Sequence, residues 1–184
     1  MKNHVVYLLV GQRGSGKSTF ASTVKKQHPE VLFLNRDDIL IEMFGSVHPD
    51  AYSGGHFVAI KELYCRFTQI TANQDESKTL LECFTGSFFE RQVLIRDLRA
   101  NGATKVIALY FVTPVELVRQ WFWQKPGIAK MGDQKKRGQD VVYYSENAPS
   151  HDFEAFHDLA RKIDINGFDE VIRIDPLNPP DIFH

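Results

Sequence analysis

The sequence predicts an α/β fold in which helices cover both faces of one parallel sheet. Two observations lead to this class. Short apolar runs rich in β-forming residues alternate with longer segments of helical character along the chain. A glycine-rich turn follows the first apolar run and precedes the first helical segment. Strands that alternate with helices imply right-handed crossovers, so we expect a parallel sheet with ligands beyond the carboxyl ends of its strands.

The first half of the chain supplies three predicted strands. Residues 4–10 (HVVYLLV) form a nearly continuous apolar run, which is typical of a buried parallel strand. Residues 31–35 and 79–84 are the second and third strands. The segments around them predict helices at residues 16–28, 36–44, 56–72 and 87–102. Gly, Pro and Ser content predicts a loop at residues 45–55.

The second half adds two strands, two helices and a lid. The predicted strands are residues 104–112 and 168–174, and the predicted helices are 114–123 and about 151–163. Residues 124–140 are basic, contain glycine and lack an apolar period, so we expect a surface loop that acts as a mobile basic lid. No linker separates these elements, and we therefore expect a single domain over residues 1–184.

Composition limits the possible partners. The 22 basic and 23 acidic residues give a net charge of −1, so no global basic field favours wrapping long nucleic acid, although a local site for one nucleic-acid end stays open. The two cysteines, Cys65 and Cys83, form no C-x-x-C motif and predict a reducing, cytoplasmic location. We expect Cys65 to lie in the core. No apolar run approaches the roughly 18 residues of a membrane span.

The stretch GQRGSGKST (residues 11–19) fits the pattern G-x-x-x-x-G-K-[ST] between a predicted strand and a predicted helix. Glycines let the backbone wrap phosphates with its N–H groups, and the helix N-terminus adds positive charge. The motif predicts that Lys17 reaches the β- and γ-phosphates and that the Ser18 hydroxyl binds Mg²⁺. The predicted nucleotide-binding set is Gly11, Gln12, Arg13, Gly14, Ser15, Gly16, Lys17, Ser18 and Thr19.

The stretch NRDD (residues 35–38) ends the second predicted strand. Transfer of a phosphoryl group to a hydroxyl needs a carboxylate near the acceptor, which orients the hydroxyl and accepts its proton. Asp37 and Asp38 are consecutive in a predicted helix, so they point about 100° apart and do not both address one atom. An acid in the first turn of a helix is stabilised by the helix dipole and needs no catalytic role. We assign this interaction with the dipole to Asp38.

These motifs resemble the polynucleotide 5′-kinase branch of P-loop kinases. The resemblance rests on the phosphate loop, NRDD, TLLECFTGSFFERQ (79–92) and YFVTPVELV (110–118), and it spans roughly residues 4–124. GFDEV (167–171) is similar to the last strand of related small AAA-type kinases, the zeta-toxin group among the relatives. The resemblance implies a P-loop NTPase three-layer sandwich with a five-stranded parallel sheet of order 2-3-1-4-5. It also implies that Asp37 is the general base.

The chain departs from that family in three places. The family has an arginine near the acceptor phosphate, three residues after the first Asp, and this chain has Leu40. The family has an Asp at the end of the third strand, whereas this chain has Cys83 preceded by Glu82. Small-molecule relatives often carry a Glu there, so we expect Glu82 to assist Mg²⁺ or to orient water. The family lid has arginines after ELV, and this chain has Arg119 followed by QWFWQK.

Further candidates surround the expected cleft. Basic residues of a lid neutralise charge on the transferring phosphoryl group, and Arg137 is our catalytic candidate among Arg119, Lys125, Lys130, Lys135, Lys136 and Arg137. The consecutive Trp121, Phe122 and Trp123 face different directions, so at least one is exposed or covers a ligand, and such a ring can stack on a base. Acceptor contacts are expected from Arg36, Asp38 and Arg91, and we also consider His48, Tyr52 and His56.

Taken together, these residues predict an ATP- and Mg²⁺-dependent kinase. The acceptor hydroxyl could belong to a polynucleotide 5′-end, a nucleoside or nucleotide, or a small molecule. Leu40 and the nearly neutral charge weaken the polynucleotide case. A P-loop ATPase or nucleotide switch without an acceptor is the alternative. The sequence contains no D-x-D-G-T phosphatase motif and does not define an oligomeric state.

Overall fold

The structure is a computed structural model that describes residues 2–47, 54–83, 86–125, 127–133, 141–150 and 157–183. Five strands form a parallel sheet of order β2-β3-β1-β4-β7. They are β1 (Asn3–Val10), β2 (Leu32–Asn35), β3 (Glu76–Glu82), β4 (Lys105–Phe111) and β7 (Glu170–Ile174). Since β7 is the fifth strand of this sheet in chain order, the predicted order 2-3-1-4-5 is confirmed.

Six α-helices lie wholly within the described residues. They are α1 (Lys17–Gln27), α2 (Arg36–Phe44), α3 (Gly55–Asn73), α4 (Phe88–Ala100), α5 (Val115–Gln124) and the short α7 (Leu159–Lys162), which a 3-10 turn (Ile163–Ile165) extends. Local signals set several starts. Asn35 caps α2 by accepting a hydrogen bond from the Asp37 amide, and Ser87 and Glu90 form a capping box on α4. Residues 151–156 of the last predicted helix lie outside the described part.

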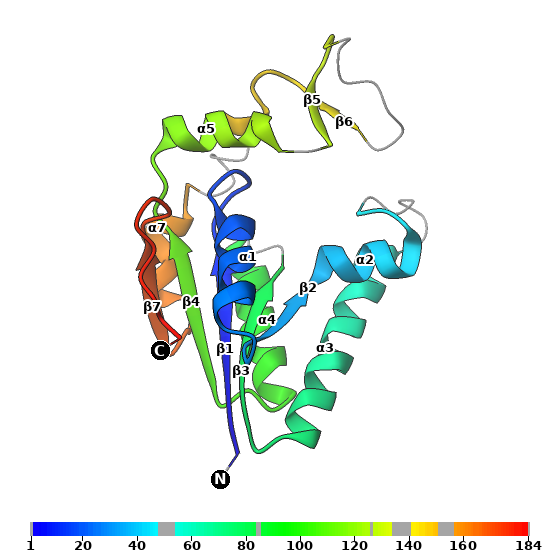
Figure 1. Cartoon of the computed structure of the whole chain (residues 1–184), viewed down its shortest axis with the longest axis vertical. Helices are drawn as coiled ribbons and strands as arrows, with labels where there is room; N and C mark the ends of the chain where they lie inside the picture. The colour runs from blue at the N-terminus through cyan, green and yellow to red at the C-terminus, as the bar shows by residue number, and fades with distance from the viewer. Residues whose placement is uncertain are drawn as a thin grey trace.

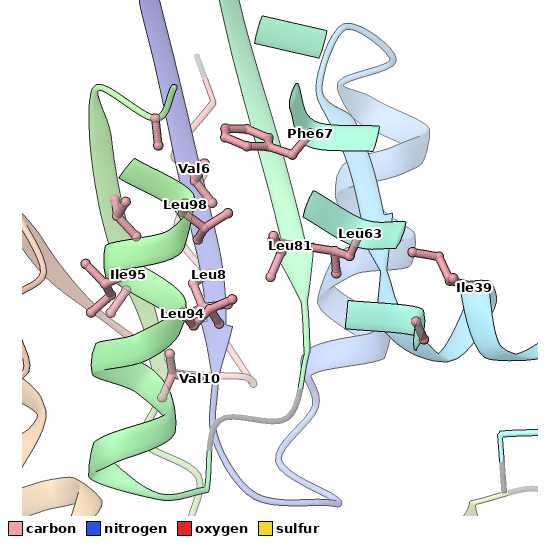
Figure 2. Packing of buried hydrophobic residues seen from close by; sticks show 14 of the residues in the cluster. Val6, Leu8, Val10, Ile39, Leu63, Phe67, Leu81, Leu94, Ile95 and Leu98 are labelled. Carbon is pink, nitrogen blue, oxygen red and sulfur yellow. The ribbon is translucent and has the colours of Figure 1, made fainter. Parts of the chain in front are cut away.

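Two separate cores cover the two faces of the sheet. On one face, residues of α2, α3, α4 and α7 form one buried cluster with alternate residues of β1 such as Val6 and Leu8. Figure 2 shows the part of this cluster that α2, α3 and α4 contribute. On the other face, α1 and the C-terminal tail pack against the intervening residues Tyr7 and Leu9. The alternation along β1 follows from the period of two in a strand. The result is the predicted three-layer arrangement (Figure 1).

Two predictions about the fold that were made from the sequence were wrong. Cys65, expected in the core, is exposed, because the buried face of α3 is formed by Ala59, Leu63 and Phe67. The segment 124–140 was expected to lack regular structure, yet β5 (Ile128–Lys130) pairs in parallel with β6 (Val142–Tyr144). Three-residue strands are too short to produce a period in the sequence, and these are stabilised by packing on α5.

The lid therefore has a small core of its own. Phe122, Ile128 and Ala148 are buried together, with Trp123 and Tyr144 packed against them. Figure 1 shows α5 and the β5–β6 pair beyond the carboxyl ends of β1 and β4. Among the described helices, none is long and apolar enough to cross a membrane.

Candidate active site

The phosphate loop, residues 11–16, joins the end of β1 to the start of α1. Its Lys17 ammonium donates hydrogen bonds to the carbonyl oxygens of Gly11 and Gln12, at 2.7 and 2.8 Å. The end of β4 fastens the loop from another side, because the Thr113 hydroxyl donates to the Ser15 carbonyl at 2.8 Å. The loop is thus held in shape by its own lysine and by a neighbouring strand end.

Gly14 has a role that the motif does not specify. Its φ is +81°, and a Cβ atom added there would lie 2.7 Å from the Val118 carbonyl oxygen and 2.9 Å from the Phe122 amide nitrogen. Any larger residue would be strained and would collide with the backbone of α5. The pattern G-x-x-x-x-G leaves this position open, so no signal in the motif pointed to the close approach of loop and helix.

A cavity of about 690 Å³ opens along the loop and the first turn of α1. This volume is in the range typical of small-molecule sites. Trp121 of α5 and Lys125, directly after this helix, line it. The segment after β7 also lines it through Pro176, Leu177 and Pro179. Of the three consecutive aromatic residues, Phe122 is fully buried and Trp121 faces the cavity. The contribution of the C-terminal tail had no signal in the sequence beyond its prolines.

Glu82 and Ser18 meet at the carboxyl ends of the central strands. The Ser18 hydroxyl donates to a Glu82 carboxylate oxygen at 3.1 Å, and the Asn35 side-chain amide donates weakly to the other oxygen at 3.5 Å. Asn35 and Glu82 are register partners in the β2–β3 pair. Residues from three separate parts of the chain therefore form one oxygen-rich group.

The acids of NRDD take different positions at the start of α2. The Arg36 guanidinium contacts the Asp37 carboxylate at 2.6 Å, and the side chains of the two are 20% and 50% exposed. Asp37 thus presents a carboxylate that is oriented by an arginine and still open to solvent. Asp38 is exposed in the first helical turn, where an acid interacts favourably with the helix dipole.

Two other sequence candidates belong to the interior. Arg91 is 1% exposed, and its guanidinium donates to Asn166 Oδ1 at 2.8 Å and to the Gly86 carbonyl at 3.0 Å. Burial lowers the pKa of Arg91 to about 10, which leaves it charged at neutral pH. This placement corrects the expected acceptor contact, because a buried guanidinium bonded to its own chain braces the start of α4. Leu40 is fully buried in the core.

The lid candidates are distributed over several positions. Lys125 lines the large cavity, Lys130 lies on β5, and the Arg119 guanidinium is exposed 3.5 Å from Glu116. His56 is exposed at the start of α3. The remaining candidates lie outside the described residues: His48, Tyr52, Lys135, Lys136 and the proposed catalytic Arg137.

The fold and this loop define a protein of the P-loop kinase-like class. A family model described as an AAA domain matches residues 6–141, which is more than half of the chain, and the chain belongs to that family. No curated protein sequence is a significant match.

Solved structures share the fold at low sequence identity. A chain of the Pnkp1/Rnl/Hen1 RNA repair complex has a TM-score of 0.67 and 17% identity, with coverage of 88% of this chain and 47% of that chain. A Chloroflexus aurantiacus protein proposed to be a kinase has a TM-score of 0.64 and 13% identity, over 95% and 89% of the two chains.

A third similar structure comes from the PezAT toxin-antitoxin system of Streptococcus pneumoniae. Its TM-score is 0.56 at 13% identity, over 95% of this chain and 69% of that chain. At such identities the similarity shows the fold alone. This chain also spans only about half of the matched RNA repair chain, 47% of its length.

Proposed function

We propose that the protein is an ATP- and Mg²⁺-dependent phosphotransferase that moves the γ-phosphoryl group to an acceptor hydroxyl. The observation that carries this proposal is a continuous set of contacts from the phosphate loop to NRDD. Ser18 contacts Glu82 at 3.1 Å, Glu82 contacts Asn35 at 3.5 Å, and Asn35 caps the helix that carries Asp37. A phosphate-binding element and an oriented carboxylate thus share one edge of the sheet, as phosphoryl transfer requires.

The nucleotide side of the cleft would work mainly through fixed dipoles and charge. Backbone N–H groups of the loop, the N-terminus of α1 and Lys17 would hold the phosphates, while Lys125 adds a second positive charge on the cavity wall. Trp121 on the same wall offers a flat surface on which adenine can stack.

The oxygen-rich group fits a magnesium site. Mg²⁺ takes oxygen ligands and is usually bound by one or two protein groups together with phosphate oxygens and water. The Ser18 hydroxyl would coordinate it and Glu82 would orient its water ligands, with Asn35 holding the Glu82 carboxylate. When bound, the metal supplies positive charge that offsets charge on the phosphate oxygens.

Asp37 would act on the acceptor. Its half-exposed carboxylate can accept a hydrogen bond from an entering hydroxyl, orient the oxygen for attack and take its proton late in the reaction. The Arg36 contact at 2.6 Å fixes the orientation of the carboxylate. Arg36 could also contact an anionic acceptor, and the exposed Asp38 lies one residue further from the strand end.

The acceptor class is open between polynucleotide 5′-ends and small molecules. Similarity to a chain of an RNA repair complex supports trying nucleic-acid ends. The fully buried Leu40, at the position where the related kinases place an acceptor-binding arginine, and the net charge of −1 favour a small molecule.

The test is a transfer screen with ATP labelled in the γ-phosphoryl group. Acceptors are DNA and RNA oligonucleotides with 5′-hydroxyl ends, nucleosides, nucleotides and small alcohols, and 5′-phosphorylated oligonucleotides serve as matched controls. We expect Mg²⁺-dependent label in one acceptor class and little in the Asp37→Asn protein. Release of free phosphate at the same rate with and without every acceptor would instead support the ATPase or switch alternative.

A further inference from the structure

Arg13 lies in the middle of the phosphate loop, yet its side chain contacts the lid. Its guanidinium donates a hydrogen bond to the Tyr144 hydroxyl at 2.7 Å. The guanidinium carbon also lies 4.9 Å from the centre of the Tyr144 ring and 5.4 Å from that of Phe122. These distances are within cation–π range. One arginine of the loop therefore contacts α5 and β6 at the same time.

The two aromatic rings are part of the small core of the lid. The Phe122 side chain is fully buried, and its ring packs edge-on against Tyr144 at 5.6 Å and Trp123 at 4.9 Å. Ile128 and Ala148 complete this core. Because α5, β5 and β6 all contribute to it, a contact that fixes Tyr144 also restrains the rest of the described lid.

Tyr144 is paired directly with a basic residue of the lid. In the β5–β6 pair its register partner is Lys130, and the Met131 amide donates to the Tyr144 carbonyl at 2.9 Å. The Lys130 ammonium lies 5.3 Å from the Trp123 ring and 3.1 Å from Glu146. The position of Tyr144 thus determines where β5 presents Lys130.

We propose that Arg13 is a positioning residue that fastens the lid to the phosphate loop through Tyr144 and thereby sets the position of Lys130. Arginine suits this place because its planar guanidinium can stack on a ring and donate a directed hydrogen bond at once, whereas lysine carries only a compact charge. The close packing of Gly14 on α5 brings the loop near enough for this contact. The link between loop and lid exists independently of which acceptor the proposed phosphotransferase uses.

Hydrogen exchange of the full-length protein tests the link without any assay of activity. The reporters are the amides of Met131 and Val142, which donate to the Tyr144 and Gly127 carbonyls. Loss of a hydrogen bond from a charged donor should speed their exchange about tenfold in Arg13→Gln, with a smaller rise in Tyr144→Phe. The matched control is Tyr143→Phe. Tyr143 directly precedes Tyr144 in β6, and successive strand residues face opposite sides of the strand. Exchange of these two amides should rise less in this control than in Tyr144→Phe.

Two further variants separate this role from a direct contact with phosphate. Arg13→Lys keeps the charge and should still loosen the lid; exchange at the parent rate would overturn the stacked geometry. The double variant Arg13→Gln/Tyr144→Phe should exchange at about the same rate as Arg13→Gln alone, because both changes remove one contact. The proposal would be overturned if the rises in exchange rate of the two single variants multiplied in full in the double variant. It would also be overturned if Tyr144→Phe alone left the exchange rate unchanged. Thermal unfolding of each variant checks that it is folded.

Enzyme kinetics give a second test of the role of Arg13 and Tyr144. This test rests on the proposed function, since it requires phosphoryl transfer. In Tyr144→Phe, kcat should fall several-fold while the ATP dissociation constant stays within about twofold, because Tyr144 acts on the lid rather than on the nucleotide. An increase in the ATP dissociation constant with unchanged kcat would contradict a positioning role. If the protein transfers no phosphoryl group at all, the proposed function fails, and the exchange experiment still decides whether Arg13 holds the lid.

Discussion

The proposed nucleotide half and the proposed acceptor half of the cleft are built in different ways. The nucleotide half is formed mainly by consecutive residues, 11–19, whose backbone and single lysine would bind the phosphates. The proposed acceptor half brings together side chains from β2, β3 and α2, and the contact of Glu82 with Ser18 joins it to the nucleotide half. A site made from backbone over a short segment can be recognised as a motif, whereas a site made from distant side chains depends on the folded sheet.

This difference predicts different consequences of mutation. Changes in the nucleotide half should remove binding and transfer together. Changes in the acceptor half should remove transfer and leave nucleotide binding in place, because the two halves share only the group around Ser18 and Glu82. The following predictions run from the largest expected effect to the smallest.

Lys17→Ala should have the largest effect. Loss of the one ammonium inside the loop should lower transfer by about 10³-fold, since a positioned charge acts strongly on the developing phosphoryl charge. Transfer of γ-label and ATP binding by calorimetry measure the effect. A variant that retains transfer would refute the phosphate-loop assignment.

Asp37→Asn should separate the two halves most clearly. We expect transfer to fall at least about 100-fold, as for loss of a general base, while ATP affinity stays nearly unchanged. The matched control is the neighbouring Asp38→Asn, which removes the same charge from the same helical turn and should lose much less. Equal losses at the two positions would end the distinction between them.

Glu82→Gln tests the residue at the junction of the two halves. The substitution keeps the shape of the side chain and removes its charge, so we expect about a tenfold higher Mg²⁺ requirement, as for other groups that orient metal ligands. Transfer rates across a Mg²⁺ titration measure it. If the Mg²⁺ dependence is unchanged, Glu82 has no role toward the metal and only holds the side chains of Asn35 and Ser18 in place.

Gly14→Ala tests the packing of the phosphate loop on the lid helix. The new methyl group would lie 2.7 Å from the Val118 carbonyl oxygen. Gly45→Ala is the matched control, since Gly45 also has a positive φ, +73°, but no atom within 4 Å of the added carbon. Chemical unfolding should show Gly14→Ala to be less stable than this control by about 1–3 kcal/mol, the usual effect of overpacking. If Gly14→Ala and Gly45→Ala lose the same amount of stability, backbone strain alone explains the effect and the contact with α5 does not contribute.

Asp169→Asn should have the smallest effect on the protein, a small loss of stability. Neither half of the cleft should be affected. Burial alone would raise the pKa of Asp169, but hydrogen bonds from the Val106 amide and Arg99 lower it overall. A lowered pKa in the folded state gives stability that is present above the unfolded pKa, near 4, and is lost as the pH falls through the folded pKa.

We therefore expect Asp169→Asn to lose about 1 kcal/mol at pH 7, an amount limited by the partial exposure of the Arg99 pair. Urea unfolding at pH 7 and in strong acid should show the two proteins converge as the pH is lowered below the folded pKa. Transfer activity should not change. A difference in stability that is the same at both pH values would contradict this account.

Local signals in the sequence determined most of the regular structure and the nucleotide half of the site. The apolar runs predicted five strands, the helical spacing of residues 36–44 predicted α2, and the glycine-lysine motif predicted the phosphate loop. The order of the sheet came from the family resemblance and is confirmed. These features could be predicted because each depends on residues within a few positions of one another.

Tertiary structure alone decided the rest. It placed Pro176 and Leu177 on the wall of the nucleotide cavity, joined Arg13 to the lid, and buried Arg91 against Asn166, which is 75 positions away in the sequence. Sequence patterns express local conformation and burial, but the partner of a charged side chain depends on which distant segment packs beside it. For that reason the phosphate loop could be predicted from the sequence, and the contacts that surround it could not.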